Sequence, residues 1–76
     1  EELAEYEELI RRLYEAISSL PPMQARRIHA RYILGIKVKD IAAMEGITPS
    51  QAGKSIRAAL RRLRRYFARQ KWTVNL

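Results

Sequence analysis

The stretch from Gly46 to Gln51 constrains the fold of this chain most, because it ends one helix and begins another. The glycine and the isoleucine after it form a turn. Thr48 then takes an N-cap position, and Pro49 takes the first helical position, where the missing N–H has no partner to lose. Gln51 stands three residues after Thr48 and completes a Thr-x-x-Gln capping box. The sequence therefore predicts a long helix from Pro49 to about Gln70.

This long helix is predicted to have one apolar face and one polar face. Apolar side chains recur at helical spacing and define the buried face: Ala52, Ile56, Ala59, Leu60, Leu63 and Phe67. The side chains turned away from it are Ser50, Lys54, Arg57, Arg61 and Arg65, with Gln51, Ala58 and Arg62 on the shoulder. A face that is polar near the capped end and cationic further along suits a helix laid in a DNA groove.

Three shorter helices are predicted before this one, over about 3–18, 22–34 and 38–45. The first has an amphipathic seam with steps of three and four residues: Leu3, Tyr6, Ile10, Leu13, Ile17 and Leu20. Pro21 and Pro22 break the chain after it, since a residue before proline leaves helical geometry. Gly35 is expected to stop the second helix.

Within these helices, apolar side chains are expected to face the core. The inward set is Ala25, Ile28, Tyr32, Ile33, Ile41 and Ala42, with Val38 and Met44 flanking the third helix. Arg26, Arg27 and Arg31 are expected to reach solvent, and His29 to lie at the surface or its boundary.

A short helix, a glycine-containing turn and a longer helix form a helix-turn-helix pattern. We therefore predict an all-α fold: a four-helix domain (about 3–18, 22–34, 38–45 and 49–70) that contains a helix-turn-helix. At 76 residues the chain is one domain. It begins with glutamate rather than methionine, so we expect it to be excised from a longer chain.

The composition disfavours several classes of function. There is no cysteine and a single histidine, so we expect no disulfide, metal site or cofactor. No Ser–His–Asp set and no glycine-rich phosphate loop is present, so we do not expect an enzyme. No apolar run approaches the ~20 residues of a membrane span, and no signal peptide begins the chain, so we expect a cytoplasmic protein.

The net charge of +7 is unevenly distributed along the chain. Residues 1–22 carry a balance of −4, and residues 23–76 carry +11. This asymmetry indicates a polyanionic partner for the second part. Nucleic acid is the first candidate. A basic helix lying on an anionic membrane surface is the second, although such a helix needs no capped turn or supporting helices.

These motifs together resemble region four of bacterial RNA polymerase sigma factors, of the extracytoplasmic-function-like type, over about Leu13 to Phe67. The resemblance rests on Leu20-Pro21, Arg27, Ile28, Arg31-Tyr32, Gly35, Ile41-Ala42, Gly46-Ile47-Thr48 and Ile56. The sequence also departs from the family. Glu45 replaces the common leucine before the turn glycine, which would leave Met44 to fill the core. Gly53 is a helix-interior glycine that costs roughly 1 kcal/mol relative to alanine; it either allows a close backbone approach or makes the helix start less rigid.

The resemblance implies recognition of the upstream (minus-thirty-five) promoter element and docking on the flap of the RNA polymerase core. The first turns of the long helix would enter the major groove of double-stranded DNA, where base edges differ. The candidates for base readout are Ser50, Gln51, Lys54 and Arg57. Gln51 suits adenine, and Lys54 or Arg57 suits guanine. The candidates for contact with the DNA backbone are Arg31, Lys37, Lys39, Thr48, Ser55 and Arg61.

An alternative function is a protein-interaction module with only non-specific DNA affinity. The acidic first helix, with Tyr6, Leu9 and Tyr14 beside its seam, would present an apolar groove to the polymerase flap or to a regulatory partner such as an anti-sigma protein. In the C-terminal tail, Trp72 would either fold back on the core or contact a partner.

Overall fold

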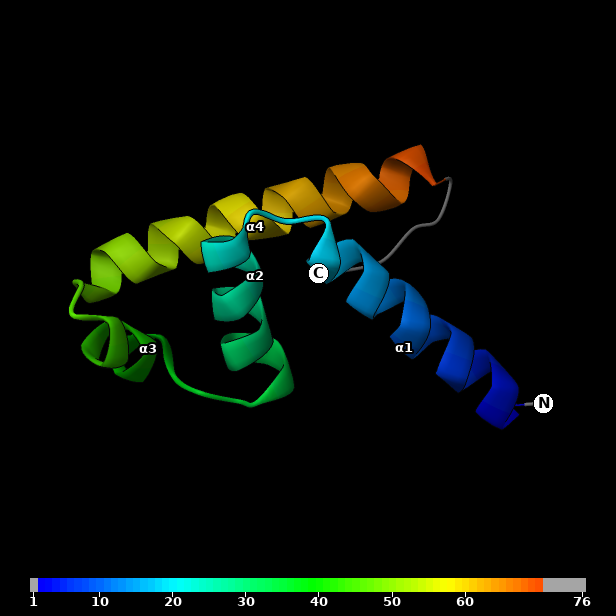
Figure 1. Cartoon of the computed structure of the whole chain (residues 1–76), viewed down its shortest axis with the longest axis horizontal. Coiled ribbons are helices and arrows are strands. Elements are labelled where there is room, and N and C mark those ends of the chain that lie inside the picture. Colours follow the sequence, from blue (N-terminus) through cyan, green and yellow to red (C-terminus); the bar gives the residue numbers. More distant parts are fainter. Residues whose placement is uncertain (1, 71–76) are drawn as a thin grey trace.

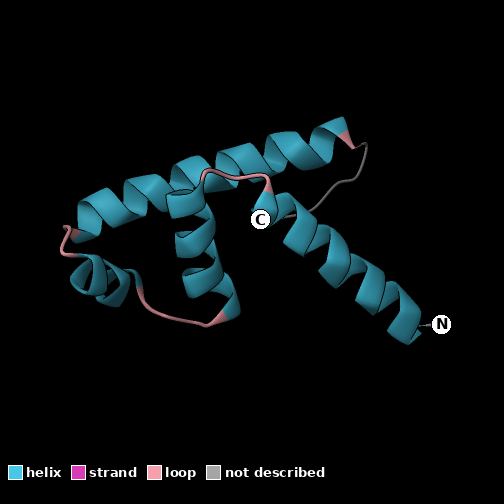
Figure 2. Cartoon of the chain, in the orientation of Figure 1, coloured by secondary structure: helices cyan, strands magenta, loops and turns pink. Residues whose placement is uncertain are grey.

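The computed structural model describes residues 2–70, and within that range every regular element is a helix. The helices are α1 (Glu2–Ser18), α2 (Pro22–Ile28), α3 (Val38–Glu45) and α4 (Pro49–Arg69), and α2 continues into a π-helical turn, η1 (His29–Ile33). Figure 2 shows that only short loops join them. The predicted all-α fold is confirmed, with each predicted helix boundary matched to within one residue. The prediction for Trp72 lies outside the described residues.

Helix α4 is the element against which the others pack. In Figure 1 it runs along the length of the molecule, with α3 near its N-terminal end and α2 against its middle. The C-terminal end of α1 contacts α2 and α4. The four α-helices and the turn between α1 and α2 contribute the buried core: Ala16, Ile17, Leu20, Ile28, Ile41, Ala42, Ala52, Ile56, Ala59, Leu63 and Phe67. The predicted apolar face of the long helix is thus confirmed, with Leu60 half-buried at its edge.

Only the second half of α1 belongs to the core. Its first turns extend away from the other helices (Figure 1). Leu3 and Tyr6 are 69% and 60% exposed, whereas Ile17 is 7% exposed. The apolar residues predicted to form a seam do lie on one helix. Those near its N-terminus, however, have nothing within residues 2–70 to pack against.

The end of the second predicted helix is wider than an α-helix. The Leu34 N–H donates to the His29 carbonyl at 3.1 Å, which is the i→i+5 bond of a π turn, and Gly35 ends the helix at φ 71°. Because the wider turn changes the angular position of the side chains, Tyr32 and Ile33 are 56% and 37% exposed. The expectation that these two face the core was wrong.

Helix α3 ends as predicted at Gly46, which has φ 69° and a left-handed conformation. Ile41 and Ala42 are buried, but Met44 is 73% exposed, so it does not fill the core. The reason is helical geometry. Glu45 follows Ile41 by four residues and stays on the inner face of α3, whereas Met44 points outward.

Gly53 lies inside α4 without a packing reason in the described chain. A Cβ atom built there would meet only the side chain of Arg57, whose Nη1 would be 3.3 Å away. No neighbouring helix lies within 4 Å of that position. Close approach to another helix of residues 2–70 therefore does not explain the glycine.

We predict that Gly53→Ala stabilises the domain by about 0.5–1 kcal/mol, because alanine restricts the unfolded chain and Arg57 has a flexible side chain that can shift. Thermal unfolding followed by circular dichroism should show a melting temperature higher by about 4–8 °C per kcal/mol. The reverse change on the same helix, Ala58→Gly, should lower it. A lower melting temperature for Gly53→Ala would contradict this explanation.

Candidate nucleic-acid interface

Four predicted contact residues lie together along the solvent side of α4. Ser50, Lys54, Arg57 and Arg61 are all exposed and follow one another at steps of four, three and four residues. We call this set the outer stripe. Since Pro49–Arg69 is one continuous helix, the stripe is a straight row that begins at the capped end with a hydroxyl and continues with three cationic side chains.

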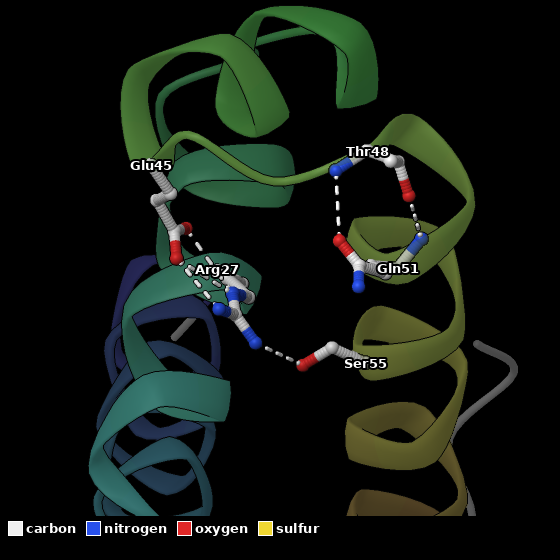
Figure 3. Close-up of polar contacts among 5 residues, drawn as sticks. All are labelled: Arg27, Glu45, Thr48, Gln51 and Ser55. Carbon is white, nitrogen blue, oxygen red and sulfur yellow. Dashed lines mark hydrogen bonds and ion pairs between the residues drawn. The ribbon is translucent and has the colours of Figure 1, made fainter.

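The predicted capping box at the start of α4 is confirmed. The Gln51 backbone N–H donates to Thr48 Oγ1 at 3.1 Å, and the Thr48 N–H donates to Gln51 Oε1 at 2.9 Å (Figure 3). The amide oxygen of Gln51 is therefore engaged within the helix start, while its amide nitrogen points away from Thr48. A bidentate contact with adenine needs both atoms, so Gln51 can offer only its donor while the box is closed.

Arg27 connects three helices at the inner side of the helix-turn-helix. Its Nε donates to the two carboxylate oxygens of Glu45 at 3.0 and 3.1 Å, and its Nη2 donates to Glu45 Oε1 at 2.6 Å. Its Nη1 donates to the Ser55 hydroxyl at 2.7 Å. Figure 3 shows the guanidinium of α2 between the end of α3 and the second turn of α4. We call Arg27, Glu45 and Ser55 the Arg27 clamp.

The Arg27 clamp is largely shielded from water. The Arg27 and Glu45 side chains are only 14% and 16% exposed. The hydrogen bonds from Arg27 hold the pKa of the Glu45 carboxyl below its ordinary value, against the opposing effect of burial. The same hydrogen bonds raise the pKa of Arg27. Both groups are therefore charged at neutral pH, and the contact is a charge-assisted, bidentate ion pair.

The clamp corrects one prediction made from sequence. Arg27 was expected to reach solvent; instead its side chain is 14% exposed and lies in the contact between α2 and α4. Ser55 was a candidate for phosphate contact; its hydroxyl accepts a hydrogen bond from Arg27, and its contact with phosphate stays a prediction. The signal available in the sequence was Glu45 itself, because an acidic residue on the inner face of α3 requires a buried cation.

The remaining candidates for backbone contact come from other elements. Lys37 is the N-cap residue of α3, without a side-chain capping bond, and Lys39 lies in the first turn of that helix; both are exposed. Arg31 lies on η1, with its guanidinium carbon 5.6 Å from the centre of the Tyr32 ring. Thr48 is exposed at the turn that leads into the outer stripe. The structure thus gathers the base-readout candidates on one helix and leaves these backbone candidates around it.

An apolar pocket of about 270 Å³ lies between α1, the α2–η1 segment and α4. Its lining is Leu13, Ile17, Ile28, Tyr32, Ile33, Leu60 and Leu63. The two residues that the π turn exposes, Tyr32 and Ile33, form part of this lining. Tyr6, Leu9 and Tyr14, which were predicted to present an apolar groove, are exposed and do not line this pocket.

Within residues 2–70, no three side chains of histidine, cysteine, aspartate or glutamate lie close enough together to hold a metal ion. None of the helices in this range has the length and apolar character needed to cross a bilayer.

We predict that Glu45→Gln lowers the free energy of unfolding by about 1–3 kcal/mol, because it leaves the shielded Arg27 without its counter-charge. The matched control is Glu8→Gln in α1, where Glu8 pairs with Arg12 but the side chains are 38% and 44% exposed. That change should cost at most about 0.5 kcal/mol. Urea unfolding of both variants measures the difference, and equal losses would contradict a stabilising clamp.

A comparison of the wild type with Glu45→Gln also tests how the stability depends on pH. The pKa of Glu45 is lower in the folded state than its ordinary value of 4.5. The ion pair therefore stabilises the fold fully at a pH above this ordinary pKa. This contribution is lost as the pH falls through the lowered folded-state pKa. The stability difference between the wild type and Glu45→Gln should therefore shrink in strong acid.

The comparisons with known proteins agree with this geometry. The family model described as sigma-70, region 4 matches residues 10–63, which is more than half of the chain. The chain therefore belongs to the sigma-70 region 4 family, and the resemblance read from the sequence is confirmed at that level. Neither the curated proteins nor the solved structures give a match. Membership connects the helix-turn-helix with DNA binding in transcription initiation.

Proposed function

We propose that this sigma-70 region 4 domain binds the upstream, minus-thirty-five-type promoter element with the first turns of α4 in the major groove. The observation that carries the proposal is the outer stripe, which begins at a capped and clamped helix start. Major-groove edges differ for each base pair, and an α-helix fits within that groove. A helix start fixed by the capping box and the Arg27 clamp can present Ser50, Lys54 and Arg57 in one orientation.

The roles divide by position along α4. Lys54 and Arg57 are the candidates for guanine contacts, Ser50 for a hydroxyl contact, and Gln51 for a donor contact from its free amide nitrogen. Arg61 lies further along the outer stripe and is suited to phosphate. Lys37, Lys39 and Arg31 supply positive charge from neighbouring elements. Such phosphate contacts provide affinity and set the register, whereas base contacts provide specificity.

A second role of the same domain is docking on the flap of the RNA polymerase core. The observation that favours it is the apolar pocket between α1, η1 and α4. The exposed Leu3 and Tyr6 extend the apolar surface of α1 beyond this pocket. A regulatory protein such as an anti-sigma factor would compete for this surface. This role is compatible with DNA binding, because α4 contributes only Leu60 and Leu63 to the pocket. Both roles place the protein in the cytoplasm.

We predict that Lys54→Ala and Arg57→Ala each weaken binding to the preferred DNA by about 1–3 kcal/mol and relax the preference at particular bases. The preferred duplex is first selected by the wild-type domain from a random pool. Fluorescence anisotropy then measures each variant on this duplex and on a scrambled one. Arg11→Ala on the acidic α1 is the control and should change neither affinity nor preference.

Lys39→Ala gives the contrasting case. It should weaken binding to all duplexes alike and lower the salt dependence, because a phosphate contact carries no sequence information. If both α4 variants keep wild-type affinity and preference, the major-groove model is wrong. Salt-sensitive binding without any sequence preference in the wild type would favour the protein-interaction function instead.

A further inference from the structure

The C-terminal half of α4 forms a second basic surface. Arg62, Arg65 and Arg69 follow one another at steps of three and four residues, so they share one side of the helix. Together with Tyr66, and with Ser19 and Leu20 of the turn between α1 and α2, they line a groove of about 330 Å³. We call it the arginine groove.

The arginine groove lies beside the outer stripe and is centred on a different side of α4. Successive residues of an α-helix are rotated by about 100°, so Arg62 points well away from Arg61. The two surfaces are nevertheless continuous, because Arg65 lies between them on the helical wheel. Moreover, Arg65, Tyr66 and Arg69 follow residue 63, where the family match ends. Half of the six residues that line the groove therefore lie beyond the part of the chain that the family model describes.

The positive charge of the groove has no counter-charge in the described chain. Within residues 2–70, Arg62, Arg65 and Arg69 make no ion pair or hydrogen bond through their side chains. The residues beside them pack into the fold: Leu20 is 7% exposed, and the Tyr66 ring packs edge-on against Phe67, with the ring centres 5.6 Å apart. Three clustered guanidinium groups attract an anion.

The chemistry of the groove favours phosphate over an acidic protein segment. Guanidinium forks match the geometry of phosphate oxygens and bind them in a bidentate manner. Protein interfaces, by contrast, bury an apolar centre, whereas half of the lining here is arginine, beside a serine, one buried leucine and one tyrosine ring. The location of the arginine groove also agrees with phosphate binding. Arg65 is about 22 Å along the helix from Ser50, which exceeds the ~12 Å width of the major groove.

We propose that the arginine groove binds backbone phosphates of the DNA outside the base pairs that α4 reads. This inference rests on the proposed insertion of the first turns of α4 into the major groove. It makes α4 a helix with two functions: the capped end selects the sequence, and the other end holds the flanking duplex.

The test compares two variants with the same change in net charge. Arg62→Gln/Arg65→Gln/Arg69→Gln removes the groove, and Arg11→Gln/Arg12→Gln/Arg26→Gln removes three arginines elsewhere. Circular dichroism verifies that both fold. Affinities are measured over a range of salt concentrations on a short duplex that holds only the selected element and on a long duplex extended by about one helical turn (~10 base pairs) on each side.

The groove variant should bind the long duplex at least tenfold more weakly than the wild type, with a salt slope smaller by about 2–3, since each phosphate contact contributes roughly 0.9. Its affinity for the short duplex and its base preference should be unchanged. Equal losses in the two variants, equal losses on the two duplexes, or no loss would each overturn the proposal. If the proposed base readout fails, the wild type will show no sequence preference. The affinities for the long and the short duplex can still be compared in that case, so the two failures are distinguishable.

Discussion

The ion pair between Arg27 and Glu45 ties together the helices of the helix-turn-helix. It joins α2 to the end of α3, immediately before the turn at Gly46, and Arg27 also holds Ser55 on α4. Buried Ile41 of α3 and Ile56 of α4 belong to the same core, and the ion pair adds a polar contact to this packing. Because a bidentate guanidinium contact is directional, it specifies one arrangement where an apolar contact would tolerate several.

The two ends of α4 are held by different contacts. The capping box begins the helix at Thr48, and the clamp at Ser55 holds its second turn, so the outer stripe starts on the best-fixed part of the helix. Further along, the apolar face through Leu63 and Phe67 anchors α4 on α1 and on the turn at Leu20. That anchoring leaves Arg62, Arg65 and Arg69 beside the turn, which creates the arginine groove. The proposed base selection and the proposed phosphate binding would thus lie at opposite ends of one continuous helix.

The features that were predictable from sequence are those set by local chemistry. Thr48, Pro49 and Gln51 mark a helix start within four residues, and helical periodicity alone places Ser50, Lys54, Arg57 and Arg61 in one row. The Arg27 clamp could not be read in this way, because it joins residues that are 18 and 28 positions apart. The π turn was not predicted either, and neither was the resulting exposure of Tyr32 and Ile33. Base readout by the outer stripe stays a prediction.

The most direct test of insertion into the major groove is a titration of the ¹⁵N-labelled domain with its selected duplex, followed by amide chemical shifts. The largest changes should fall on the first turns of α4, from Ser50 to Arg57, with smaller changes around Arg62 and Arg69. The N-terminal half of α1, which carries most of the acidic residues of that helix, should not change. Changes confined to the arginine-rich half of α4, or centred on α1 and η1, would contradict insertion of the capped end into the major groove.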